Sequence, residues 1–462
     1  MNGSAADPEG AAEGASAEVR AALAAVFDPG LRADPYGPLA VLREAAPVLY
    51  DEESGTRFLT GFADCQAVLA GPDFVVPDGP WLAREHPEWA ARPAADFFYA
   101  SLLGTNGAAH ERLRGPLTAV FGPRRAAELS AGVEKVVDEL LDRFEDATSD
   151  GGAADFQALV GYPLPVAVVG ELIGVPRAEQ ERFHRLGRDA ARLLEPVRSD
   201  EDWRRADTAV TALREYFTGL LRERRARPAE DLASALLARE GAAGSAPARR
   251  VREPAAGPSG GRTRPSGGRA RPSAARERPP AENGHPLGER ELADLLLLVF
   301  VAGFETTAGL LGTAVSALLA HPEQAALLRA DPGLLPGAVE EALRWDGPVL
   351  MTERLAARPT EVGGVAVPAG GSVTAVLGAA NRDPRRYPDP DAFLVTRPDV
   401  RVLSFGAGPH YCFGAALARL EAAVLLGRLS ARFPRLAPAG PPVRRASACL
   451  RSFDALPLAA TG

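Results

Sequence analysis

FGAGPHYCFGAALARLE, residues 405–421, places Cys412 between a glycine-rich turn and an alanine-rich segment that predicts a helix. An isolated cysteine is most often a small buried apolar residue. Here Gly406, Gly408 and Gly414 permit tight turns and close backbone approach. The first N–H groups of the predicted helix have no helical acceptors, and such groups stabilise a thiolate, the form of cysteine that binds metal. We therefore interpret Cys412 as a candidate metal ligand.

Two aromatic residues, Phe405 and Phe413, lie on either side of the cysteine in the sequence. A thiolate with a flat glycine face and aromatic neighbours suits the proximal side of a haem. The alternative interpretation is that the GAG sequence belongs to a dinucleotide-binding loop. Its third glycine has the wrong spacing for that loop, and no acidic residue follows at the required distance.

The composition bounds the possible functions. The chain has 462 residues, of which 46% are hydrophobic and 24% charged, so it can bury a large core. Its net charge of -8 gives no reason to expect nucleic-acid binding. The three cysteines form no CxxC pair and cannot supply four thiolates to an ordinary iron–sulfur cluster.

Most of the chain has helical periodicity. Apolar residues recur at helical spacing in 126–146, 202–226 and 321–330. Around 354–378 the period changes, and valines alternate with small or polar residues around paired glycines, which predicts short hairpin strands. We expect a mainly α protein with minor β structure.

Two regions are expected to lie outside the packed domain. Residues 1–20 are small and acidic, without the features of a signal or transit peptide, so we expect a flexible N-terminus and a cytoplasmic protein. Residues 241–284 form a Gly-, Pro-, Ser- and Arg-rich insertion that predicts disorder. Within it, 245–280 carries nine Arg and two Glu, a local charge of +7. A solvated insertion is the simpler interpretation, and a docking arm for an acidic partner is the alternative.

The apolar stretch 294–320 is long enough to span a bilayer. Glu305 lies at its centre, however, and no basic or aromatic belt flanks it. A helix buried inside a soluble core fits these features better, so we expect no membrane association.

The same stretch contains VFVAGFETTAG, whose residues are candidates for a role in catalysis. Gly303 weakens the helix, and the Thr306 hydroxyl can bond to the carbonyl of Ala302, opening the helix locally. Glu305 then offers a proton source and Thr306 a hydroxyl. The alternative is an ordinary Glu–Thr pair within a core helix.

Taken together, FGAGPHYCFGAALARLE resembles the haem-binding signature of the cytochrome P-450 superfamily. The residues that match are Phe405, Gly408, His410, Cys412 and Gly414, with Ala418 and Arg419 downstream. The resemblance extends from ADPYGPLAVLREAAPV near the start to LRSFDALPL near the end. It implies the fold of that family over 21–462, a single helix-rich domain with small sheets and haem b buried between two long helices.

The resemblance is to the soluble bacterial branch. The strong preference for Arg, with Lys135 the only lysine, suggests an actinomycete-like source. For this branch the family implies external electron donors, a ferredoxin and its reductase, and we expect a monomer.

The resemblance also implies roles for charged residues elsewhere. Glu341 and Arg344, three apart in EEALRW, are similar to the structural ExxR pair, with Arg397 as the expected third partner. The residues implied for the haem propionates are His110, Arg114, Arg354 and His410. Many relatives have His where Val402 stands, so the contribution of that His is absent or comes from Arg401.

The function that follows is a haem-thiolate monooxygenase acting on dioxygen and a small molecule. We expect Cys412 to bind the iron, and Ala302 and Gly303 to border the haem. Glu305 and Thr306 are expected to handle protons, and the resemblance implies that both lie over the distal face of the haem. The reaction is expected to be hydroxylation or epoxidation of a hydrophobic or amphipathic compound of secondary metabolism. The ranges expected to contact this substrate are 75–105, 298–302, 349–352 and 450–453.

Two rival functions from other classes were weighed. A haem-thiolate sensor or carrier would need the cysteine but not Glu305 and Thr306. A recruitment domain of a biosynthetic assembly line would keep the fold and lose the haem motifs, which are intact here.

Overall fold

The computed structural model describes residues 16–28, 34–118, 121, 128–195, 199–245 and 286–460, with no side-chain description for 150 and 241–245. The expected flexible N-terminus and the expected insertion therefore fall largely outside the described residues. Their boundaries differ slightly from expectation, because the first helix begins at Ala17 and another continues to Ser245.

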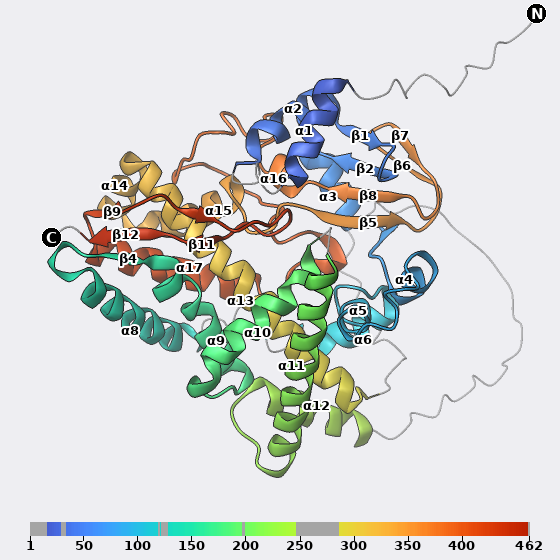
Figure 1. Ribbon diagram of the computed structural model, residues 1–462, viewed down its shortest axis with the longest axis horizontal. Helices are drawn as coiled ribbons and strands as arrows, with labels where there is room; N and C mark the ends of the chain where they lie inside the picture. The colour runs from blue at the N-terminus through green and yellow to red at the C-terminus, as the bar shows by residue number, and fades with distance from the viewer. Residues whose placement is uncertain are drawn as a thin grey trace, which may run out of the picture.

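The predicted helices are present (Figure 1). Residues 202–226 lie in a helix beginning at Asp200, 321–330 in one beginning at Pro322, and 126–146 overlaps one beginning at Ser130. The helices are α1 Ala17–Phe27, α2 Tyr36–Ala45, α3 Phe62–Ala70, α4 Gly79–Glu85, α5 Pro93–Ala100, α6 Gly107–Thr118, α8 Ser130–Thr148, α9 Pro163–Ile173, α10 Gln180–Ala190, α11 Asp200–Ala226, α12 Leu232–Ser245, α13 Glu289–Ala320, α14 Pro322–Ala330, α15 Leu335–Trp345, α16 Leu377–Ala380 and α17 Ala415–Arg432.

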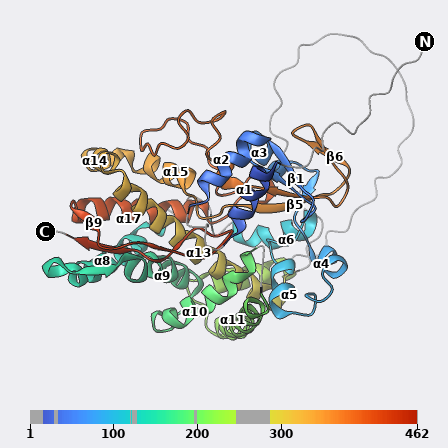
Figure 2. The same cartoon turned by 45° about the horizontal axis from the view of Figure 1, so that its top comes forward.

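The helix α13 crosses the middle of the molecule in both views (Figures 1 and 2). Its first half packs in a core shared with α9, α10 and α11, and its second half in a core shared with α8, α15 and α17. It is long and apolar enough to cross a membrane, but 83% of its most apolar window is buried inside the protein. The prediction of a core helix at 294–320 is thus supported by packing.

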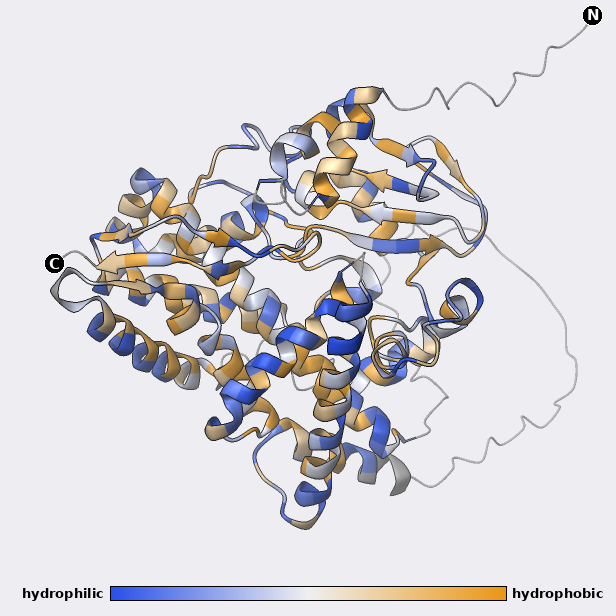
Figure 3. Ribbon diagram, in the orientation of Figure 1, coloured by the Kyte–Doolittle hydropathy of each residue, from blue (hydrophilic) through white to orange (hydrophobic). Residues whose placement is uncertain are grey.

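The outer helices are amphipathic, as Figure 3 shows for α8, where hydrophilic and hydrophobic residues alternate along the helix. On α8 the buried side chains are spaced by three or four residues, for example Val133, Val137, Leu140 and Phe144. This spacing places them on one face, so α8 covers the core while its other face meets solvent.

The strands form small sheets at the edge of the helical body. The largest has the order β1-β2-β8-β5-β3, in which only β2 and β8 run parallel. The hairpin strands predicted within 354–378 are present, and Gly363 and Gly364 turn β6 into β7 with positive φ. The strands are β1 Val48–Asp51, β2 Thr56–Leu59, β3 Phe74–Val75, β4 Ala153–Asp155, β5 Thr352–Ala356, β6 Thr360–Val362, β7 Val365–Val367, β8 Ser372–Ala375, β9 Leu436–Pro438, β10 Val443–Arg444, β11 Phe453–Ala455 and β12 Pro457–Ala460.

Candidate active site

The loop before α17 presents Cys412 through two glycines with left-handed backbone. Gly406 and Gly408 both have φ of +69°, a conformation that other residues adopt at a cost. A Cβ at Gly408 would also lie 2.7 Å from the Cα of Ala70, so the loop packs closely against α3. Gly414 then caps α17, which begins at Ala415 as the sequence predicts.

The Cys412 side chain is exposed, yet protein atoms surround it closely enough for burial to raise the pKa of its thiol. A ligand can therefore reach this thiol although protein atoms surround it. The backbone N–H groups of Gly414 and Ala415 donate to it, and together with the charges of Arg114 and Arg419 they act to lower its pKa. The helix start therefore stabilises a thiolate in the expected way.

Arg419 of α17 also contacts this loop. Its guanidinium lies 4.4 Å from the centre of the Phe405 ring, and its Nε donates to Glu340 at 2.5 Å. The charge of Arg419 is therefore already compensated within the protein.

The four residues expected at the haem propionates form one basic cluster. The rings of His110 and His410 lie 4.2 Å apart, and Arg114 donates to the carbonyl of Tyr411 at 2.6 Å. Burial, and then the charges of His110, Arg354 and Arg114, lower the pKa of His410 to about 3. Burial followed by the charge of Arg114 also lowers the pKa of His110.

Arg354 makes this cluster suited to an anion. It is only 6% exposed, and burial lowers its pKa to about 10. It donates to the Thr352 hydroxyl and to the carbonyl of Glu353, and no carboxylate among the described residues lies within ion-pair distance of it. A buried guanidinium without a counter-ion is costly, and a propionate at this place would compensate it. The residues present thus fit a haem.

Arg401 does not take over the role of the His that Val402 replaces. The Arg401 side chain is exposed and pairs with Asp399 at 3.2 Å. That alternative is wrong, and His110, Arg114, Arg354 and His410 are the basic groups that gather here.

Three residues of α13 form an accessible patch on an otherwise buried stretch. Ala302, Gly303 and Thr306 remain partly exposed, while Val301, Phe304, Glu305 and Thr307 are buried. The Thr306 hydroxyl donates to the carbonyl of Ala302 at 2.8 Å, as predicted. Partial exposure at this point of a buried helix is what we expect of residues next to a haem and its ligands.

Glu305 points differently from its neighbour Thr306. Its side chain is fully buried and forms an ion pair with Arg445. Successive residues of an α-helix are rotated by about 100°, so neighbours cannot share one face. In this conformation the acid is turned into the protein, and a position for both residues over one face of the haem does not follow. Arg445, 140 positions away, was missed because no spacing rule links two such distant residues.

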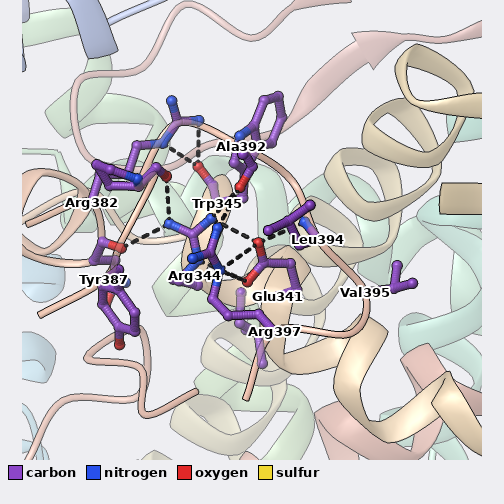
Figure 4. A network of polar contacts seen from close by, with 12 residues as sticks. Glu341, Arg344, Trp345, Arg382, Tyr387, Ala392, Leu394, Val395 and Arg397 are labelled. Carbon is purple, nitrogen blue, oxygen red and sulfur yellow. Dashed lines mark hydrogen bonds and ion pairs between the residues drawn. The ribbon is translucent and has the colours of Figure 1, made fainter. Parts of the chain in front are cut away.

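The expected ExxR network is present with its third member (Figure 4). Glu341 accepts from Arg344 Nε and Nη2 at 2.8 Å each, and from Arg397 Nε at 3.1 Å. Leu394 N–H adds a further donor at 2.9 Å. The prediction that Arg397 completes this network is confirmed.

The ranges expected to contact substrate do not all lie in one part of the structure. Leu298, Val349 and Leu450 belong to the same apolar core cluster as Phe98 and Ala302. Phe453, in contrast, is fully buried in the other core cluster and lies under the guanidinium of Arg444. Range 75–105, expected as a loop, contains α4 and α5.

Comparisons with known proteins agree with this geometry. The family model Cytochrome P450 matches residues 274–443. The chain is 34% identical to 6-deoxyerythronolide B hydroxylase of Saccharopolyspora erythraea, covering 93% of this chain and 96% of that protein. It is also 34% identical to the cytochrome P450 monooxygenase PikC of Streptomyces venezuelae, covering 88% of this chain and 85% of that one.

A solved structure of P450BioI in complex with an acyl carrier protein ligated to hexadec-9Z-enoic acid is similar over the whole fold. It has a TM-score of 0.79 and 27% identity, covering 93% of this chain and 99% of that one. From the extent of these similarities, the chain belongs to the cytochrome P450 family and is a haem-b-dependent, haem-thiolate monooxygenase.

Proposed function

We propose that Cys412 is the thiolate ligand of the haem iron and that the basic cluster binds the propionates. The observation that carries this proposal is Arg354, a buried guanidinium that lacks a carboxylate partner among the described residues, in the same molecule as an accessible thiol at the start of α17. Phe405, Gly408 and Gly414 shape the loop on the thiolate side, and Ala302 and Gly303 border the other side.

When bound, the haem supplies the activation of dioxygen, and the protein supplies orientation, exclusion of water and protons. Thr306 holds its hydroxyl at the accessible patch, where it can pass a proton onward. Glu305, one position before Thr306, is the nearest acid in sequence, and we propose it as the proton source, a role that requires its side chain to leave the orientation described above.

The ligand assignment is tested by the carbon monoxide complex of the reduced protein. Thiolate ligation gives a red-shifted Soret band, which Cys412→Ala should lose. Cys449→Ala is the matched control, because the Cys449 thiol is buried and contacts the carbonyl of Met351. An unchanged band in Cys412→Ala would refute the assignment.

The proton roles have a separate test. Thr306→Ala should consume reductant while releasing hydrogen peroxide in place of product, and Glu305→Gln should slow turnover without disturbing haem binding. Unchanged coupling and rate in both variants would remove these residues from the reaction.

The substrate we propose is a hydrophobic or amphipathic secondary metabolite of macrolactone size. Support comes from the apolar cluster of Leu298, Val349 and Leu450 and from the relative whose name gives 6-deoxyerythronolide B as its substrate. Spectral shifts of the haem on adding macrolactones, steroids, terpenoids and carrier-bound acyl chains would decide between free and carrier-bound substrates. A response to none of the macrolactones would contradict the proposal.

We further propose a cytoplasmic monomer that receives electrons from a ferredoxin and a separate reductase. Protein with NADPH alone should be inactive, and ferredoxin plus reductase should restore turnover. Because Arg419 already pairs with Glu340, its contribution to electrostatic steering is expected to be small. Turnover without a partner protein would contradict the electron route.

A further inference from the structure

Leu450 belongs to a short buried segment between β10 and β11. Residues 447–450 are all buried, and Leu450 packs in the apolar cluster that also contains Leu298 and Val349. These are the apolar residues to which we assign contact with the substrate. The position of Leu450 therefore depends on the bonds that hold the segment at its two ends.

The end after Leu450 has a deeply buried anchor. Arg451 donates from Nε to Asp346 at 2.9 Å. Asp346 is buried directly after α15, and it also accepts from the Tyr36 hydroxyl at 2.8 Å and from Arg444 at 2.8 Å. Several bonds would have to break together to release this end, so it is fixed to the scaffold of the protein.

The end before Leu450 is held by the carboxylate of Glu195. This carboxylate accepts from the Ser447 hydroxyl, from the Ala448 N–H at 2.9 Å and from the Cys449 N–H at 3.4 Å. The Ser447 hydroxyl in turn accepts from the Leu450 N–H at 2.7 Å. A hydroxyl has one proton to donate, and while that proton is bonded to Glu195 a lone pair stays available for the Leu450 N–H. Glu195 is therefore connected to the backbone of Leu450 through a single hydroxyl group.

Glu195 comes from a different part of the chain, 252 positions before Ser447. It follows the short 3₁₀ helix Ala191–Leu194, which contacts α10, α11 and α13. Leu193 of this helix is buried in the same apolar cluster as Leu450. Glu195 itself is only partly buried, unlike Asp346 at the other end. One accessible carboxylate thus joins two segments that both contribute to the apolar cluster.

Val349 is coupled to Leu450 through the backbone. The two residues form an isolated β-bridge, and the Leu350 N–H donates to the carbonyl of Cys449 at 2.8 Å. A displacement of 447–450 would therefore move two of the apolar side chains assigned to the substrate.

We propose that Glu195 is a positioning residue that holds Leu450 and Val349 in place for a large apolar substrate. With Glu195 the segment is ordered before the ligand arrives, so binding does not have to supply the cost of ordering it. Without Glu195 the buried N–H groups of Ala448 and Cys449 lose this acceptor, and the segment loses its anchor before Leu450. A ligand too small to reach Leu450 should be unaffected. This inference rests on the proposed substrate contacts and adds the residue that positions them.

Spectral titration of the holoenzyme with two azoles of different size tests the inference without turnover. Imidazole is small enough to bind at the haem alone, whereas econazole carries chlorinated aromatic rings that have to enter the apolar cluster. Glu195→Ala should raise the Kd of econazole by about tenfold, change the Kd of imidazole by less than about twofold and keep the thiolate Soret band. A general loss of folded protein would weaken both azoles alike, so the ratio of the two Kd values isolates the positioning role. A ratio in Glu195→Ala equal to that of wild type would overturn the inference.

Three further variants sharpen this test. Glu195→Gln keeps one acceptor oxygen at the same length and should restore part of the affinity for econazole. Glu181→Ala is the matched control, because Glu181 is exposed on the neighbouring α10, and it should leave both Kd values unchanged. Ser447→Ala breaks the same connection to Leu450, so the double variant Glu195→Ala/Ser447→Ala should weaken econazole by less than the product of the two single effects.

Two other outcomes would count against the inference in different ways. Independent, fully multiplicative effects of Glu195→Ala and Ser447→Ala on the Kd of econazole would refute the connection through the Ser447 hydroxyl. If imidazole failed to shift the Soret band of wild type, the proposed haem site would be refuted, and this inference with it.

Discussion

Glu341 and Glu305 are both buried glutamates that pair with arginine, but their surroundings differ. Glu341 receives donors from Arg344, Arg397 and the Leu394 N–H, and both of its oxygens are used. Among the residues that the structure describes, Glu305 has one ion-pair partner, Arg445, and one oxygen without a partner. The first arrangement has several contacts that would have to break together, whereas the second depends on one.

This difference separates a fully satisfied ion pair from a partly satisfied one. Arg344 also donates to the carbonyls of Pro390 and Ala392 at 2.6 and 2.8 Å, so the network fixes the segment after α16 onto α15. A fully satisfied polar network stabilises a unique arrangement, whereas a buried polar atom without a partner is costly. The number of donors around the carboxylate therefore predicts which pair is static.

The largest effect is expected from breaking the satisfied network. Arg344→Gln removes the main cation of Glu341 and leaves backbone carbonyls without donors, so we expect a loss of about 3–5 kcal/mol in the free energy of unfolding. The measurement is the yield of haem-bound soluble protein and its thermal midpoint. Arg329→Gln is the matched control, because Arg329 lies on the exposed surface of the neighbouring α14. A midpoint for Arg344→Gln equal to that of the control would show that the network carries no stability.

A smaller effect is expected at the half-satisfied pair. Arg445→Met leaves the buried Glu305 without its cation, whereas Glu305→Gln/Arg445→Met removes both charges. The double variant should therefore be more stable than Arg445→Met alone by about 1–3 kcal/mol. Chemical unfolding of wild type, the two single variants and the double variant gives this coupling energy. Strict additivity would mean that the two side chains do not interact in solution.

Much of this site could be predicted from the sequence because its parts are local. The turn at Gly406 and Gly408, the helix start at Gly414 and the Thr306–Ala302 bond all depend on residues within a few positions of one another. Such contacts follow from backbone geometry alone. The Arg397 partner of Glu341 is 56 positions away and followed from the family resemblance instead.

The rest required the tertiary structure. The Glu305–Arg445 contact depends on where the β10–β11 hairpin packs against α13, and no periodicity in the sequence encodes that placement. For the same reason the sequence could not show that only one end of range 450–453 lies near the other expected substrate contacts. Residues three positions apart in an extended chain point to opposite sides, and Leu450 and Phe453 lie in different cores. Of the two alternatives for the missing His, a replacement by Arg401 could not be judged from the sequence, because sequence position does not give the direction of a side chain.

The smallest effect is expected at Glu421, a buried glutamate with no cation within ion-pair distance in the described part of the chain. Its pKa of about 8 lies above its ordinary value of 4.5, so between these pH values the folded protein binds a proton that the unfolded chain does not. Its contribution to stability is therefore fully present below pH 4.5 and is lost as the pH rises through 8. Glu421→Gln replaces a neutral acid by a neutral amide of the same size, so at pH 5 the variant should unfold within about 1 kcal/mol of wild type. As the pH rises from 5 to 8 the wild type should lose stability that the variant keeps, so the two curves should diverge over this range and run parallel above it. Parallel stability curves from pH 5 to 9 would show that Glu421 is already charged in the folded protein. In that case a buried carboxylate would be tolerated here without a cation, and the comparison with Glu305 would lose its physical basis.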